Sequence, residues 1–135
     1  MFEKDYLMRL FATLINALNR IINCIEADDI ENAKIQLDDA YQLLGNNASY
    51  FYNTDISEII HFFKNKDENY LEKVKFLSEL MYYDSLIQSN VEIEKDILKK
   101  AIHLLEYHNN NTNIYSLELN NKLISMKEKL SLLPH

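Results

Sequence analysis

Glycine and proline are almost missing from this chain, and that shortage constrains the fold more than any other feature of the sequence. Among 135 residues there is one glycine, Gly45, and one proline, Pro134. Tight β-hairpin turns depend on residues that adopt positive φ angles, above all glycine. Helices joined by short polar turns need few such residues, and a hydrophobic content of 47% is enough to form a packed core. We therefore predict an all-α fold of antiparallel helix hairpins, with about six helices in a single domain over residues 1–135.

The charge of the chain is acidic and evenly spread. The sequence contains 21 acidic and 14 basic residues, which gives a formal net charge of −7, and no segment of it is basic. Nucleic-acid-binding proteins need a basic patch, and anionic membranes attract basic segments. The sequence therefore predicts no nucleic-acid partner and no membrane partner.

The first apolar segment is interrupted by polar residues, among them Arg9, Asn16 and Arg20. A secretory signal has an unbroken apolar run after a positively charged start, so this segment does not have the pattern of a signal or of a membrane span. The single cysteine, Cys24, cannot form an internal disulfide, which favours a reducing compartment. We expect a cytoplasmic protein.

Hydrophobic residues at helical spacing predict six helices, over residues 4–26, 30–44, 55–63, 70–88, 92–107 and about 112–133. Asp28 or Asp29 is expected to cap the second helix, and Gly45 to end it. Ile93 and Ile97 are expected to face inward from the fifth helix. The run of three asparagines at 109–111 is expected to be a surface turn, and residues 46–53 are the least regular part of the chain.

The first helix has an apolar face that is wider than one neighbouring helix covers. One flank of that face consists of Leu10, Ala17, Ile21 and Cys24. We expect either a later helix or a second copy of the chain to cover this flank. It is therefore the candidate interface of a homodimer.

The segment from Asp28 to Ala40 resembles the second helix of a tetratricopeptide repeat, which places small, large and small residues at fixed offsets. Ala33, Leu37 and Ala40 fit this pattern, and Leu98 and Ala101 repeat part of it 61 residues later. The first helices of the two units depart from the pattern, because Ile21 and Tyr82 stand where the repeat has a small residue. The resemblance implies tetratricopeptide-like helix hairpins or, where it departs, an irregular bundle.

The chain also resembles an uncharacterised bacterial family of small, all-helical, tetratricopeptide-like domains of unknown function. The resemblance is carried by the opening Asp5-Tyr6-Leu7-Met8-Arg9 and by the order of the predicted helices up to about residue 107. It implies a helical fold and a bacterial cytosolic setting. It implies no catalytic chemistry.

Glu58 and His61 have the Glu-x-x-His spacing that helical metal sites use, since residues three apart share a helix face. Such sites need further carboxylate and histidine ligands, and His103 and His108 have no glutamate three residues before them. The other interpretation is that Glu58 caps the third predicted helix and His61 is an exposed side chain. Cys24 is expected to be a buried, unreactive thiol.

Tyr50, Phe51 and Tyr52 form the one aromatic cluster outside the predicted helices. Such a cluster can bind a peptide by stacking, or it can close the end of a helix hairpin. The sequence leaves both interpretations open.

The sequence contains no phosphate-binding glycine loop, no nucleophile elbow and no zinc-ligand spacing. We therefore expect no enzyme and no cofactor. The expected function is a non-catalytic protein-interaction or self-association module whose protein partner is unknown. The alternative is a small-ligand or metal site centred on Glu58 and His61.

Overall fold

The computed structural model describes residues 2–66 and 68–134, and it confirms the predicted all-α fold. Helices make up 82% of it, and the described residues contain no strand. They form seven helices, one more than expected: α1 (Phe2–Glu26), α2 (Ile30–Leu43), α3 (Ala48–Asn53), α4 (Ile56–Lys64), α5 (Tyr70–Leu86), α6 (Val91–Asn111) and α7 (Leu117–Leu132).

Both ends of α2 follow the predicted turn chemistry. Asp29 is the N-cap of α2, and its side chain accepts a hydrogen bond from the backbone N–H of Asn32 at 3.3 Å. Gly45 follows the last turn of α2 with a φ of 110°, which a residue with a side chain rarely adopts. These two residues therefore fix where α2 begins and ends.

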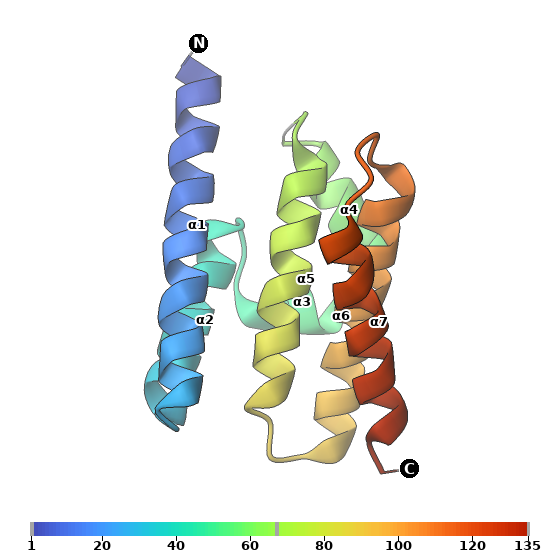
Figure 1. Ribbon diagram of the computed structural model, residues 1–135. Helices are drawn as coiled ribbons and strands as arrows, with labels where there is room; N and C mark the ends of the chain where they lie inside the picture. The colour runs from blue at the N-terminus through green and yellow to red at the C-terminus, as the bar shows by residue number, and fades with distance from the viewer. Residues whose placement is uncertain (1, 67, 135) are drawn as a thin grey trace.

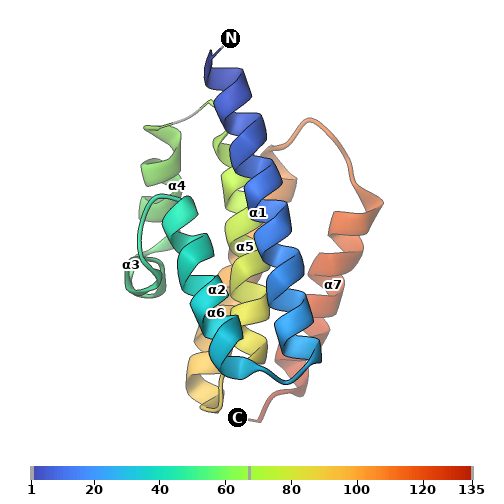
Figure 2. The same ribbon diagram turned by 90° about the vertical axis from the view of Figure 1, so that its left-hand side faces the viewer.

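The helices form two layers (Figure 1). Helices α1, α5 and α7 lie in the layer nearer the viewer, and α2 and α6 lie behind them. The α1–α2 and α5–α6 hairpins stand side by side, with α5 against both α1 and α2. Figure 2 shows α3 and α4 on the opposite side of the molecule from α7. The short helices thus cover one side of the two hairpins.

Three segments differ most from the sequence prediction. Residues 48–53 are helical because Asn47 caps α3, its side chain accepting a hydrogen bond from the N–H of Tyr50 at 2.8 Å. The asparagines at 109–111 continue α6 instead of forming a turn, with the Asn111 side chain bonded to the Tyr107 carbonyl at 2.8 Å. Helix α7 begins later than expected, after Ser116, which caps it.

The core runs from α1 to α7 as one cluster of buried side chains. Helix α5 is its centre: nine of its residues are buried, including the polar Lys73, Ser78, Asp84 and Ser85. Ala33 and Ala40 on α2 have no exposed surface, as close helix packing at small residues requires. None of the helices in the described part of the chain has the length and apolar character that a membrane crossing needs.

The flank of α1 that was expected as a candidate interface lies inside the fold. Leu10, Ala17 and Ile21 are buried, and Cys24 is partly buried against the core. Helices α2 and α5 of the same chain are the neighbours of α1. This flank is therefore not available for contact with a second copy of the chain. Self-association through other surfaces stays a prediction.

We predict that Ala17→Glu unfolds or strongly destabilises the protein. Ala17 is 2% exposed, so the substitution places an unpaired carboxylate in the core. The free energy of unfolding should fall by about 3–5 kcal/mol. Ala12→Glu, on the exposed side of the same helix, is the matched control and should change little. Urea denaturation followed by circular dichroism measures both; a folded, stable Ala17→Glu variant would contradict the burial of this flank.

Candidate functional site

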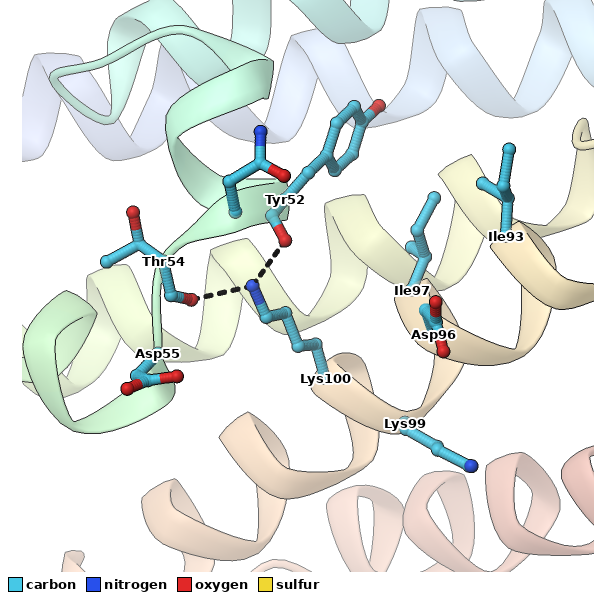
Figure 3. A pocket seen from close by; sticks show the side chains of 9 residues that line it. Tyr52, Thr54, Asp55, Ile93, Asp96, Ile97, Lys99 and Lys100 are labelled. Carbon is cyan, nitrogen blue, oxygen red and sulfur yellow. Dashed lines mark hydrogen bonds between the residues drawn. The ribbon is translucent and has the colours of Figure 1, made fainter.

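An open cleft of about 650 Å³ lies between the α3–α4 junction and the first half of α6. Figure 3 shows the side chains around it. Two large apolar side chains of the lining are exposed: Tyr52 at 37% and Ile93 at 47%. The complete lining is Tyr52, Asn53, Thr54, Asp55, Ile93, Asp96, Ile97, Lys99 and Lys100.

The α3–α4 junction is a sharp change of direction between two short helices. Helix α3 ends at Asn53, and Thr54 and Asp55 have extended backbones with ψ angles of 139° and 148°. Asp55 is the N-cap of α4, but its side chain makes no capping hydrogen bond. Asp55 and Glu58 have the spacing of a reciprocal capping pair, but the Asp55 half of that pair is absent, and the Asp55 carboxylate remains exposed at the cleft.

Lys100 joins α6 to this junction. Its ammonium group donates hydrogen bonds to the backbone carbonyls of Phe51, Tyr52 and Thr54 at 2.8, 2.7 and 2.6 Å; Figure 3 draws two of these bonds. An ammonium has three donors, so all of them are used. Burial lowers the pKa of Lys100, while the nearby charges of Asp55 and Asp96 act to raise it.

Behind the cleft wall, the carboxylate of Asp84 is 2% exposed and accepts hydrogen bonds from three residues. Tyr41 on α2 donates to Oδ2 at 2.7 Å, and Tyr52 on α3 donates to the same oxygen. The amide of Gln88 donates to Oδ1 at 2.8 Å. This buried cluster fixes the Tyr52 ring from its hydroxyl end.

The two tyrosines of the cluster hold their protons more strongly than an exposed tyrosine. Burial is the largest cause for both, and the negative charge of Asp84 is the next. The pKa of Tyr41 and the pKa of Tyr52 are therefore raised well above the usual value of 10.0. Both hydroxyls remain hydrogen-bond donors at any physiological pH.

Tyr52 also separates the cleft from a smaller pocket of about 150 Å³. That pocket reaches Asp84 and Gln88 from the α2 side, where Lys34, Leu37 and Asp38 complete its lining. One aromatic side chain thus forms a wall of both spaces.

The aromatic cluster that the sequence singled out is divided between the core and the surface. Phe51 has no exposed surface and packs with Tyr41, Phe62 and Phe63. Tyr50 is partly buried, and its ring contacts Phe62. Phe51 therefore fits the interpretation that the cluster closes the core, and only Tyr52 reaches a cleft, so the binding interpretation stays a prediction for Tyr52 alone.

The other candidate residues of the sequence lie elsewhere. Glu58 and His61 are exposed on α4, and the ring Nε2 of His61 lies 3.2 Å from the Asn65 amide. Within residues 2–66 and 68–134, no three metal-ligating side chains gather around one point. His103 is exposed and His108 is buried, with its Nδ1 2.9 Å from the Asn109 side-chain oxygen.

Comparison with known proteins gives no assignment: no protein-family model, no curated protein and no solved structure matches the chain. The fold and the cleft define an all-helical protein with an open surface groove. Its function has to be argued from that groove.

We predict that stability decreases steeply in alkaline solution. The pKa values of Tyr41 and Tyr52 are higher in the folded than in the unfolded state. Their stabilising effect is therefore fully present below the unfolded value of about 10 and is lost as the pH rises above it. The ultraviolet absorbance of tyrosinate should show two tyrosines that ionise only when the helical circular dichroism is lost. Ionisation of all nine tyrosines in the folded protein would contradict the buried cluster.

We predict that Asp84→Asn destabilises the protein by about 1–3 kcal/mol, because hydrogen bonds to a charged acceptor are stronger than those to an amide oxygen. The exposed Asp39 on α2 provides the control: Asp39→Asn should leave the free energy of unfolding almost unchanged. Denaturant titration at neutral pH measures both variants. Equal stability of the two would show that the Asp84 carboxylate is not needed.

Proposed function

We propose that this protein is a non-catalytic interaction module and that the cleft beside α6 holds a segment of a partner protein. The observation that carries the proposal is the cleft itself, an open hollow of about 650 Å³ with exposed apolar side chains in its lining. Tyr52 and Ile93 expose apolar surface there beside the polar Asn53 and Thr54. Aromatic and aliphatic anchors surrounded by polar groups are typical of protein-binding surfaces.

The walls of the cleft are held in place before any partner arrives. Lys100 fixes the backbone of the α3–α4 junction, and Asp84 fixes the Tyr52 hydroxyl. A preformed site loses little conformational entropy on binding, which favours affinity. The fixed walls therefore support the interpretation that the cleft is a binding site.

The contacts of Asp84 and Lys100 favour a structural role for these two charged groups over a catalytic one. Asp84 already accepts from Tyr41, Tyr52 and Gln88, and all three donors of Lys100 are engaged. A general acid or base needs a proton to exchange with a substrate, and these groups have none free for it. We therefore propose a module without catalytic activity or cofactor.

The α1–α2 and α5–α6 hairpins, standing side by side with small residues at their contacts, support the tetratricopeptide-like interpretation and the resemblance to the bacterial helical family. Self-association is a second form of the same proposal, because α1 exposes Met8 and Ile15, and α7 exposes Ile124. The small-ligand or metal alternative at Glu58 and His61 has less support, since both side chains are exposed.

We predict that Ile93→Glu abolishes partner binding. The immobilised protein is incubated with an extract of its native host cells, and retained proteins are identified by mass spectrometry. A charge at Ile93 removes the apolar surface at the mouth of the cleft. The matched control is Ile124→Glu, which changes a similarly exposed isoleucine on α7.

A partner retained by the parent and by Ile124→Glu, but not by Ile93→Glu, supports the proposal. Loss only with Ile124→Glu places the interface on α7 instead of the cleft. If no protein is retained above the level of an unrelated control protein, the interaction function is wrong. Circular dichroism of each variant confirms that the helices remain.

A further inference from the structure

Helix α7 is the least buried of the long helices. The structure describes all 16 of its residues, and Met126 is the only one of them that is buried. Leu119, Leu123 and Leu130 lie on the same helix face as Met126, at steps of four and three residues, and are only partly buried. Both views place α7 at an edge of the bundle (Figure 1 and Figure 2). An element with so little apolar burial is among the first to detach from a folded protein.

The ion pairs that join α7 to the rest of the chain are exposed. Lys122 lies 3.2 Å from Glu79 on α5, and Lys127 lies 3.1 Å from Glu106 on α6. All four side chains keep between 17% and 52% of their surface exposed. Exposed ion pairs contribute little to stability, so these contacts orient α7 across α5 and α6 without holding it firmly.

The segment that connects α6 to α7 exposes apolar side chains. It consists of residues 112–116 and contains no acidic or basic residue. Ile114 and Tyr115 are 76% and 77% exposed, and Leu117 at the start of α7 is 63% exposed. Three large apolar side chains exposed within four residues form the kind of patch that marks a contact with another molecule.

We infer that two copies of the chain exchange their α7 helices and form a dimer in which each α7 packs on α5 and α6 of the other copy. The occupant fits, because the exchanged helix makes the contacts that it makes within one chain. This inference specifies how the protein associates with itself, and it does not depend on the cleft beside α6.

Exchange also covers the apolar connecting segment. Five residues span at most about 20 Å between the end of one helix and the start of the next. The two connecting segments of an exchanged dimer therefore run through the same gap between the two copies, where Ile114, Tyr115 and Leu117 of both chains meet. A single closed chain leaves these three side chains in water.

The test uses two variants of the full chain, both with Cys24→Ser, of which one carries Glu79→Cys and the other Lys122→Cys. They are unfolded together in urea, refolded as an equal mixture at high micromolar concentration and treated with a short bis-maleimide. Because the Glu79 and Lys122 side chains are in contact, exchange places the two thiols of different chains together. A denaturing gel should show a linked product of twice the 16.0 kDa mass of one chain. Asp39→Cys on α2 replaces Glu79→Cys in the control mixture and should give no linked product.

The connecting segment is tested in the same assay with Ile114→Asp in both chains. The linked product should decrease by about tenfold, since an apolar side chain buried in the dimer is replaced by a charged one. Ile35→Asp is the matched control, because it adds the same charge at an exposed isoleucine of α2 and should change little. Circular dichroism should show unchanged helix content in both variants.

A mixture without linked product overturns the inference, because each α7 then stays on its own chain. A dimer that light scattering detects but the reagent does not link also overturns it, since the two copies then meet through another surface. Equal losses with Ile114→Asp and Ile35→Asp contradict the role of the connecting segment and overturn the exchange geometry. None of these results affects the cleft, which the Ile93→Glu comparison tests separately.

Discussion

The buried carboxylate of Asp84 joins parts of the chain that are far apart in the sequence. Its partners are Tyr41 on α2, Tyr52 on α3 and Gln88 just after α5. A carboxylate that is 2% exposed is costly unless its oxygens accept hydrogen bonds, so all three donors have to be in place together. This requirement fixes the position of the α1–α2 hairpin relative to α5 and the position of α3 relative to both.

Lys100 fixes the position of the α3–α4 junction relative to α6, as Asp84 fixes that of α3 relative to α5. The last carbonyls of a helix lack hydrogen-bond donors within the helix. Here the Lys100 ammonium donates to two such carbonyls of α3 and to the carbonyl of Thr54, which follows the helix. The same contacts set the shape of the cleft and leave Asp55 and Asp96 exposed beside it. One lysine thus stabilises a helix end and fixes one wall of the cleft.

Turn and capping preferences predicted the helical fold and the ends of α2, because both depend on residues that are close in the sequence. The scarcity of glycine indicated a helical fold, and Asp29 and Gly45 marked the ends of α2 correctly. Asn47, which caps α3, is of a residue type that favours helix N-caps. The sequence nevertheless predicts an irregular segment at Tyr50, Phe51 and Tyr52, because a six-residue helix is too short to show a hydrophobic period. Ile93 was expected to face the core with Ile97, since the two share a helix face, yet it lies half-exposed at the mouth of the cleft.

The sequence by itself determined that this chain is helical, where most of its helices begin and which faces of them are apolar, because those properties depend on contacts within a few residues. Only the tertiary structure decided that the flank of Leu10, Ala17, Ile21 and Cys24 is covered by the chain's own helices, and that Asp84, Lys100, Asp55 and Asp96 surround Tyr52. The hydrogen bonds that join Tyr52 to Asp84 and Lys100 span 32 and 48 positions of the sequence. Helical periodicity shows which side of a helix is apolar, but it cannot show which distant helix packs there, because that choice depends on the shape and the hydrogen-bonding groups of both surfaces.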